Sequence, residues 1–164
     1  GNSGNPIFDW FIGRELNPRI GEFDIKTFNE LRPGLILWAL LDISCVCHQY
    51  TKFGWVSDSI VLVTLFHVWY IVDSLINEST ILTQMDITTD GFGFMLSVGD
   101  LAWLPFTYCL QARFLAFHPI HLGWLGVLAI LAVQFTGYYI FRVANLEKNE
   151  FRHGRNPKGT YAMR

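Results

Sequence analysis

Long apolar runs separated by short polar stretches make up most of this chain. The last of them, residues 114–141, contains no Asp, Glu, Lys or Arg. It is longer than the roughly 20 apolar residues with which a helix crosses the hydrocarbon core of a bilayer. Three earlier runs carry few charges. The pattern predicts an all-α integral membrane protein, a polytopic transmembrane helix bundle with about four spans, at 33–50, 57–77, 93–112 and 120–142.

Two prolines mark features of these predicted helices. Pro33 fits the first turn of a helix, where its missing N–H costs little. Pro105, together with Asp100, interrupts the third apolar run. A kinked or broken helix is therefore expected there.

The segments outside the predicted spans are mixed or polar. Residues 1–32 alternate aromatic with charged side chains and are broken by prolines and glycines, as in an interfacial loop. Phe8, Trp10 and Phe11 in this segment suit the headgroup level of a membrane. Residues 78–90 are interpreted as a polar loop, and residues 143–164 as a basic tail.

The distribution of Lys and Arg orients the predicted bundle. Four crossings place residues 1–32, the acidic loop and the tail from Arg142 on one side, with ten Lys and Arg residues. The two remaining turns, on the other side, hold Lys52 and Arg113 alone. Ten against two follows the positive-inside rule, so both ends and the acidic loop are expected in the cytosol.

Composition narrows the possible functions. Hydrophobic residues make up 51% and charged residues 16% of the chain, with a mean hydropathy of +0.29, which favours a membrane protein. A formal net charge of −2 argues against a nucleic-acid partner. Cys45, Cys47 and Cys109 match no zinc or redox spacing and are interpreted as reduced core residues. No metal site is expected, and the oligomeric state stays open.

Residues 70–100 depart from the rest of the chain, because they hold five carboxylates and no Lys or Arg. Ionisable groups in or beside membrane spans are expensive, which makes them site candidates. Asp86 and Asp90 are four residues apart. Either Asp90 caps the following helix in a wet loop, or one of the two stays protonated in an apolar site. Tyr70 and Asp73 are three apart, and such a Tyr can donate a proton or simply satisfy a buried hydrogen bond.

The predicted second span has a polar face. His67, Tyr70, Ser74 and Asn77 recur at spacings of three, four and three, so they share one side of a helix, which should look inward. On this face His67 is interpreted as a satisfied core histidine rather than a ligand.

Two cations follow the last predicted span. Lys148 and Arg152 are four apart and share a face of any helix that continues beyond the membrane. Two cations in that position suit an anionic phosphate. The alternative is that they are ordinary basic residues beside a span, placed as the positive-inside rule requires.

Four runs of the sequence resemble the sterol reductase family, in the family's order: GRELNPRIGEFDIKTFNELRPGL, TQMDITTDGFGFML, WLPFTYCLQARFL and GYYIFRVANLEKNEFR. Together they cover nearly all of the chain. TTDGFGF and GRELNPRI are closer to the fungal sterol C-14 reductases than to the 7-dehydrocholesterol reductase branch. The membrane domain of the lamin B receptor is similar too.

The resemblance implies reduction of the C14=C15 double bond of sterol intermediates by NADPH, in ergosterol-type synthesis. It also implies a multi-pass protein of the endoplasmic reticulum membrane, whose partners are the sterol substrate and the lipid bilayer. An olefin accepts hydride poorly until it is protonated. The enzyme must therefore supply a proton and stabilise a developing carbocation.

Site residues are carried over from the matched runs. Tyr70 is the candidate catalytic residue that faces the sterol. By the same resemblance Lys148 and Arg152 match the KNxFR element and should contact NADPH phosphates, with Asn149 adjacent, so that the tail begins the cofactor site. The expected residues of the substrate pocket or its surroundings are Asp73, Asn77, Glu78, Asp86 and Asp90.

The chain opens on GNSGNP without an initiator Met and ends before three later blocks of the family that complete the cofactor pocket. It therefore looks like a piece of a longer protein, and we expect the isolated chain not to turn over. The alternatives are a lamin B receptor-like membrane domain of the nuclear envelope, a sterol C-7 reductase, and a structural bundle that uses polar residues between helices.

Overall fold

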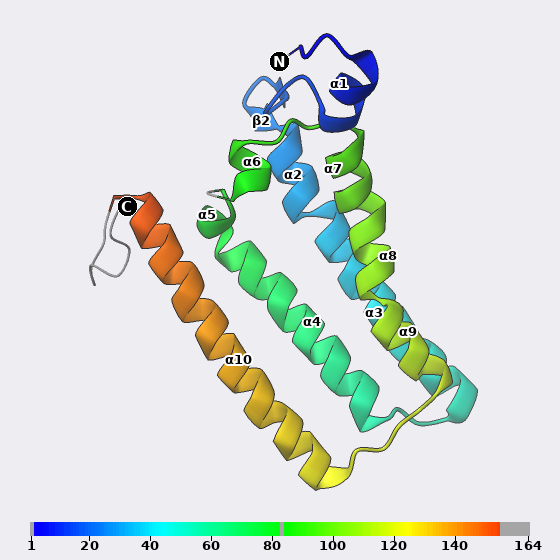
Figure 1. Cartoon of the computed structure of the whole chain (residues 1–164). Helices are drawn as coiled ribbons and strands as arrows, with labels where there is room; N and C mark the ends of the chain where they lie inside the picture. Colours follow the sequence, from blue (N-terminus) through cyan, green and yellow to red (C-terminus); the bar gives the residue numbers. More distant parts are fainter. Residues whose placement is uncertain (1, 83, 155–164) are drawn as a thin grey trace. The chain divides into compact units, whose positions relative to one another are not determined.

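The chain folds almost entirely into helices (Figure 1). The structure, a computed structural model, describes residues 2–82 and 84–154. Two compact units make up the fold, Gly1–His121 and Leu122–Arg164. The elements of the first unit are α1 (Pro6–Ile12), β1 (Arg19–Ile20), β2 (Phe23–Asp24), α2 (Ile25–Leu31), α3 (Pro33–Phe53), α4 (Asp58–Ile76), α5 (Glu78–Ile81), α6 (Met85–Thr88), α7 (Phe94–Val98), the π-helix η1 (Gly99–Trp103), α8 (Leu104–Tyr108) and α9 (Leu110–Phe117); the second holds α10 (Gly123–Arg152).

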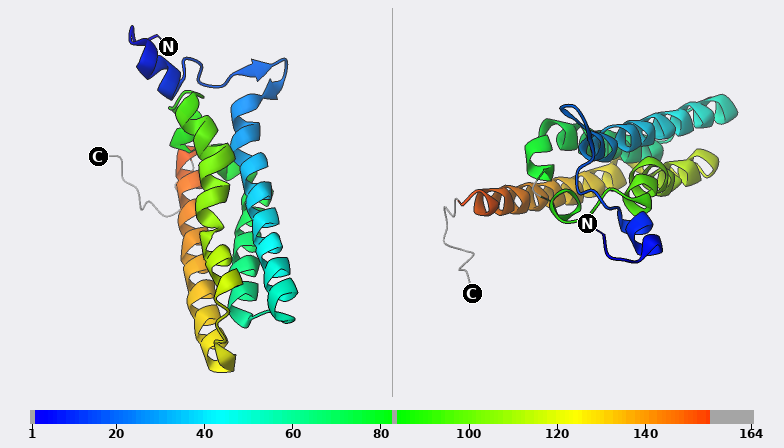
Figure 2. Two further views of the ribbon diagram at one scale, coloured as in Figure 1. Left: turned by 90° about the vertical axis from the view of Figure 1, so that its right-hand side faces the viewer. Right: turned by 90° about the horizontal axis from the view of Figure 1, so that it is seen from above.

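The first unit is built on the antiparallel helices α3 and α4. Both pack against α9, and α3 also packs against α8 and η1 (Figures 1 and 2). The centre of this packing is a small apolar core of Leu35, Trp38, Ile71 and Cys109. One end of the unit carries α1, the β1–β2 hairpin, α2, α6 and α7 (Figure 1). The candidate site lies where this end meets the long helices.

Three helical stretches among the described residues are long and apolar enough to cross a membrane: Ile25–Phe53, Asp58–Ile76 and Gly123–Arg152. None of the residues of α10 is buried, although the helix is rich in Leu, Val and Phe. An apolar surface of this extent requires a lipid or protein environment. The predicted class, an all-helical membrane protein, is confirmed.

The predicted third span is not one continuous helix. Residues 94–117 form α7, η1, α8 and α9 in succession, so the predicted break is confirmed. Pro105 has no N–H to donate to the carbonyl four residues earlier, and the regular helical ladder gives way to the π-turn that contains Asp100. Whether residues 93–112 cross the membrane stays a prediction.

The two predicted loops contain more structure than expected. Residues 1–32 hold α1 and α2 with the hairpin, and residues 78–90 hold α5 and α6. Short-range capping explains part of this: the Asn5 side chain accepts from the N–H groups of Ile7 and Phe8, and that of Asp24 accepts from the N–H of Thr27. Residues 155–164 of the predicted tail lie outside the described residues.

One of the two alternatives for Asp90 and the expectation for Cys47 were wrong. Asp90 does not cap the following helix: α7 begins after Gly93, with no side-chain capping bond. Cys47 is exposed on α3 rather than part of the core.

Three glycines allow two distant backbones to cross. The chain after α1 turns at Gly13, with φ +97°, and lies directly against the Gly91–Gly93 loop. A Cβ at Gly93 would lie 2.5 Å from the carbonyl carbon of Ile12, and one at Gly13 would lie 2.5 Å from that of Phe92. The Phe92 N–H donates to the Glu15 carbonyl at 2.9 Å. The glycines in FIGRE and DGFGF are therefore explained by one contact.

We expect Gly93→Ala to destabilise the protein by about 1–3 kcal/mol, because the added methyl group overlaps backbone atoms that cannot rotate away. Thermal unfolding in detergent would measure this. Gly99→Ala is the matched control, since a Cβ added at Gly99 would have no neighbouring atom within 4 Å. Equal melting temperatures for the two variants would contradict the close approach.

Candidate active site

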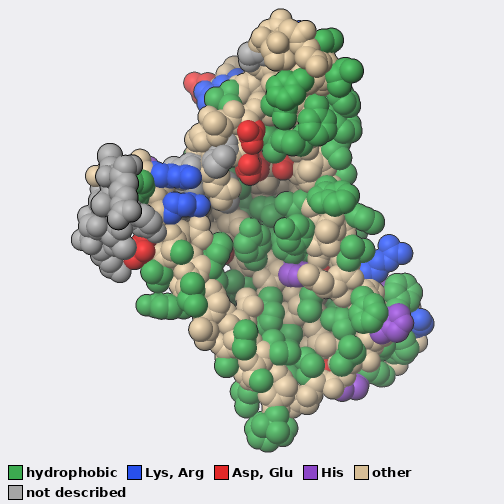
Figure 3. Space-filling view, viewed as in Figure 1, with side chains coloured by type: hydrophobic (Ala, Val, Ile, Leu, Met, Phe, Trp, Pro, Cys, Tyr) green, Lys and Arg blue, Asp and Glu red, His purple; other side chains and the backbone are tan. Residues whose placement is uncertain are grey.

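Three acidic residues line a cavity of about 190 Å³ at one end of the first unit. Tyr70 and Ser74 of α4 line one part of it. Residues of α2, α3, η1 and α8, and of α6 with the residue just before it, complete the lining: Glu30, Leu31, Leu35, Gln84, Asp86, Asp100 and Leu104. The space-filling view shows acidic side chains gathered in a hollow between green apolar surfaces (Figure 3). One tyrosine and three carboxyl groups thus share a partly enclosed space.

Two of these carboxyl groups have an unused acceptor. Oε2 of Glu30 and Oδ2 of Asp100 are buried and have no hydrogen-bond partner among the described residues. The charges of Glu30, Asp86 and Asp100 also act on one another. Buried acceptors are normally satisfied, so unpaired ones in a cavity mark a place for a ligand group, a proton or water.

Close backbone packing places Asp100. The Cα of Gly34, in the first turn of α3, lies against the Asp100 carbonyl, and the Pro105 ring is the next neighbour. A side chain at Gly34 would push η1 away from α3. The glycine after Pro33 therefore brings Asp100 to the same cavity as Glu30.

Aromatic packing against α3 holds the face of α4 on which Tyr70 lies. The Trp38 ring is 97% buried and lies between three rings, with centroid distances of 4.7 Å to His67, 5.9 Å to Tyr70 and 5.0 Å to Tyr108. The Tyr70 ring thus has a packed neighbour on α3 while the residue also lines the cavity.

The other predicted pocket residues do not line this cavity. Asn77 donates to the backbone carbonyl and to Oδ1 of Asp73, at 2.9 and 3.1 Å. Glu78 forms a two-bond ion pair with Arg32, at 3.0 and 3.3 Å. Asp90 contributes its backbone carbonyl to a bond from Lys26. Of the six residues, the structure brings Tyr70 and Asp86 together.

Sequence reasoning missed Glu30 and did not assign Asp100. Asp100 carried a detectable sign, being an acid inside an apolar run. Glu30 carried no such sign, because it lies among charged residues in a segment that reads as interfacial. Only the packing of α2 against α3 and η1 turns it toward the cavity.

A second polar cluster lies deeper in the first unit. Nδ1 of His67 is 2.6 Å from Oδ2 of Asp42, whose side chain has no exposed surface. This separation is that of a hydrogen bond, so His67 Nδ1 and Asp42 Oδ2 each have a partner. The interpretation of His67 as a satisfied core histidine therefore agrees with the geometry.

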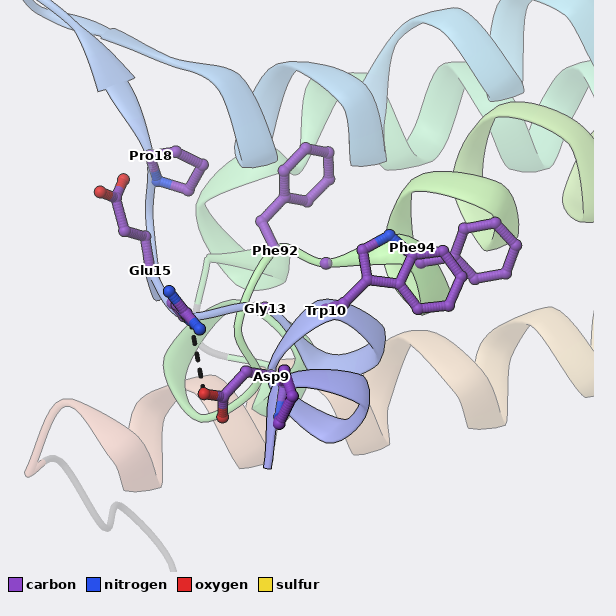
Figure 4. A pocket seen from close by; sticks show the side chains of 10 residues that line it. Asp9, Trp10, Gly13, Glu15, Pro18, Phe92 and Phe94 are labelled. Atoms are coloured by element: carbon purple, nitrogen blue, oxygen red, sulfur yellow. Dashed lines mark ion pairs between the residues drawn. The ribbon is translucent and has the colours of Figure 1, made fainter. Parts of the chain in front are cut away.

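A larger pocket of about 540 Å³ lies beside α1 (Figure 4). Trp10 stacks on Phe94 with ring centroids 4.4 Å apart, and Asp9 pairs with Arg14 at 3.4 Å. Hydrogen bonds from Ser3, then the charge of Arg14, lower the pKa of Asp9. Asp9 is therefore ionised at neutral pH and cannot donate a proton. Although larger, this open pocket offers less acid–base chemistry than the cavity at Tyr70.

The second unit carries the predicted phosphate-binding residues. The 30 residues of α10 span about 45 Å, so the helix extends well beyond a hydrocarbon core of roughly 30 Å. Lys148 and Arg152 lie in its last two turns, one helical turn apart, as expected. Between them, Oδ1 of Asn149 is buried without a hydrogen-bond partner among the described residues. Two cations and an amide on one helix end fit an anionic group such as a phosphate.

The fold and the cavity define a helical membrane protein with an acid-lined site beside a tyrosine. The model of the ergosterol biosynthesis ERG4/ERG24 family matches residues 1–163. The chain belongs to this family.

Curated relatives agree on a branch of the family. The chain is 67% identical over 157 residues to the delta(14)-sterol reductase erg24 of Schizosaccharomyces pombe. The matched region covers 95% of the chain and 37% of that protein. It is 58% identical over 155 residues to the delta(14)-sterol reductase ERG24 of Saccharomyces cerevisiae (94% and 35%), and 57% identical over 159 residues to that of Candida albicans (96% and 36%). The chain thus spans little more than a third of the length of these relatives.

Proposed function

We propose that this chain forms part of a delta(14)-sterol reductase of the endoplasmic reticulum membrane, and that the cavity at Tyr70 is one wall of its sterol site. The observation that carries the proposal is the meeting of Tyr70 with Glu30, Asp86 and Asp100 in one cavity. The names of the relatives supply the reaction, reduction of the sterol C14=C15 bond.

The reaction needs what the cavity contains. In our proposal the Tyr70 hydroxyl gives its proton to C15, which forms the new C–H bond and leaves positive charge at C14. NADPH, when bound, supplies the hydride that C14 accepts. The nearby carboxylates stabilise the developing cation, because their negative charge is already in place where the positive charge forms. The tyrosinate then regains a proton from solvent by way of the cavity acids.

The cavity is too small to hold a whole sterol. Small-molecule sites usually measure about 300–1,000 Å³, against about 190 Å³ here. It suits the reacting part of the substrate, and in our proposal the rest of the site comes from the remaining length of the relatives. Asp73, Asn77, Glu78 and Asp90 then support its wall through the bonds described above.

The cofactor side of the proposal uses Lys148, Asn149 and Arg152. The two cations would bind phosphate groups of NADPH, and the Asn149 amide would hydrogen-bond a neighbouring polar group. The separation of four residues on a continuous helix supports this assignment.

A chimera tests the proposed activity. This chain replaces the matching 157 residues of the S. pombe relative, and the chimera is expressed in fungal cells that lack their own delta(14)-sterol reductase. We expect their membranes to convert a 14-ene sterol into the 14,15-saturated product with consumption of NADPH. A chimera that is inserted intact but leaves the 14-ene sterol unreduced, while the native relative reduces it, would contradict the proposal.

In the active chimera, Lys148→Ala and Arg152→Ala are each expected to raise the KM for NADPH by about 10- to 100-fold. Each removes a hydrogen bond from a charged group, worth about 1.5–3 kcal/mol. Steady-state kinetics at saturating sterol would measure the change. Arg113→Ala is the matched control, because Arg113 is an exposed cation of α9, and it should leave KM unchanged. Wild-type KM values in both α10 variants would refute the cofactor assignment.

A further inference from the structure

Lys26 is a lysine with no exposed surface. It occupies the first turn of α2, just after the Asp24 cap. Lysine is almost never fully buried unless it is paired, since removing an ammonium group from water is costly. The proposed reaction gives this residue no role, so its burial requires another explanation.

The Lys26 ammonium binds the segment that carries Asp86. Nζ donates to the backbone carbonyl of Ile87 at 3.0 Å and to that of Asp90 at 2.5 Å. These carbonyls lie in and just after the one-turn helix α6, which is too short to hold itself in place. Ile87 is itself buried. Lys26 therefore ties α6 to α2, across more than 60 residues of sequence.

The same ammonium lies among the acids of the cavity. The carboxylates whose charge acts on Lys26 are those of Glu30, Asp90, Asp24 and Asp86. Lys26 and Glu30 are four residues apart and share one face of α2. A positive charge at this point offsets the repulsion among carboxyl groups that α2, α6 and η1 bring together.

We propose that Lys26 is a positioning residue of the Tyr70 cavity. Its buried ammonium fixes the Ile87–Asp90 backbone, so that Asp86 lines the same cavity as Tyr70, and it lets several carboxyl groups share that cavity. This proposal rests on the proposed function for its catalytic consequence. Its structural half, the attachment of α6 to α2, is independent of any activity.

Two measurements on the chimera test the proposal. The first is hydrogen–deuterium exchange of the backbone amides at 86–92 in detergent, and the second is kcat for a 14-ene sterol with the KM for NADPH. In Lys26→Met we expect faster exchange in this segment and a kcat lowered by about 10- to 100-fold, because small displacements of a catalytic group have effects of that size. The KM for NADPH should stay unchanged. Lys26→Arg, which keeps charge and donors, should recover most of kcat.

Controls separate positioning from a general loss of stability. Lys52→Met removes an exposed lysine at the far end of α3 and should change neither measurement. If Lys26→Met does not accumulate, Lys26→Gln, which keeps a donor but loses the charge, takes its place. Unchanged exchange at 86–92 would overturn the proposal, and so would faster exchange with a wild-type kcat. If the unmodified chimera is inactive, the proposed function fails, and exchange alone decides whether Lys26 holds α6.

Discussion

Replacing Tyr70 by Phe is expected to lower the kcat of the chimera on a 14-ene sterol by about 10²- to 10⁴-fold, the usual contribution of a positioned general acid. The substitution removes one hydroxyl group and keeps the ring that packs against Trp38. Sterol binding should therefore change little. Rates of product formation under saturating NADPH would show the effect in kcat rather than in KM.

The matched control for this prediction is Tyr50→Phe. Tyr50 is an exposed tyrosine near the other end of α3, and it does not line the cavity. It should keep wild-type kcat. A Tyr70→Phe variant within about twofold of wild type would mean that Tyr70 is not the proton donor. Glu30→Gln, Asp86→Asn and Asp100→Asn would then identify which cavity acid supplies the proton, because each keeps the shape of the side chain but cannot donate it as an acid.

Replacing His67 by Leu is expected to destabilise the protein by about 1–3 kcal/mol, because it leaves a buried carboxyl group without its hydrogen-bond partner. Asp42 has no exposed surface, and its Oδ1 already lacks a partner among the described residues. Loss of His67 would remove the partner of Oδ2 as well. Unfolding in a denaturing detergent, followed by circular dichroism, would measure the change in the free energy of unfolding.

The double variant Asp42→Leu with His67→Leu gives the decisive comparison. Removing both partners leaves no unsatisfied polar group at this position, so the double variant should be more stable than His67→Leu alone. His48→Leu is the control. His48 is an exposed histidine of α3 whose ring lies tilted against that of Phe117, with centroids 4.8 Å apart, and its effect should stay within about 0.5 kcal/mol. Purely additive losses in the double variant would show that the pair contributes little.

The long helices could be predicted from the sequence because their causes are local. A helix that crosses a membrane needs a charge-free run of sufficient length, and residues 114–141 contain such a run. Pro33 and Pro105 act on their own backbone, so the start of α3 and the break after α7 were expected. The spacing of Lys148 and Arg152 likewise fixes a shared face on α10.

The contents of the cavity could not be predicted in the same way. Periodicity says which face of a helix is polar, but it does not say which distant segment that face will meet. Tyr70 and Asp86 were expected near one another only through family resemblance. The sequence led us to expect the Asp90 side chain in the substrate pocket. In the structure it is the Asp90 backbone carbonyl that accepts a hydrogen bond from Lys26.

By itself, then, the sequence determined the class of the protein, its main helices, its family and the cation pair of α10, all of which follow from composition, local backbone chemistry or matched motifs. The tertiary structure alone decided that Glu30 and Asp100 join Tyr70, that Asp42 pairs with His67, and that Lys26 is buried beneath α6. The physical reason is that these groups are 25 to 70 residues apart in the chain. Their meeting depends on close packing at Gly34 and at the Gly13–Gly93 crossing, and on the cost of leaving a buried charge without a partner.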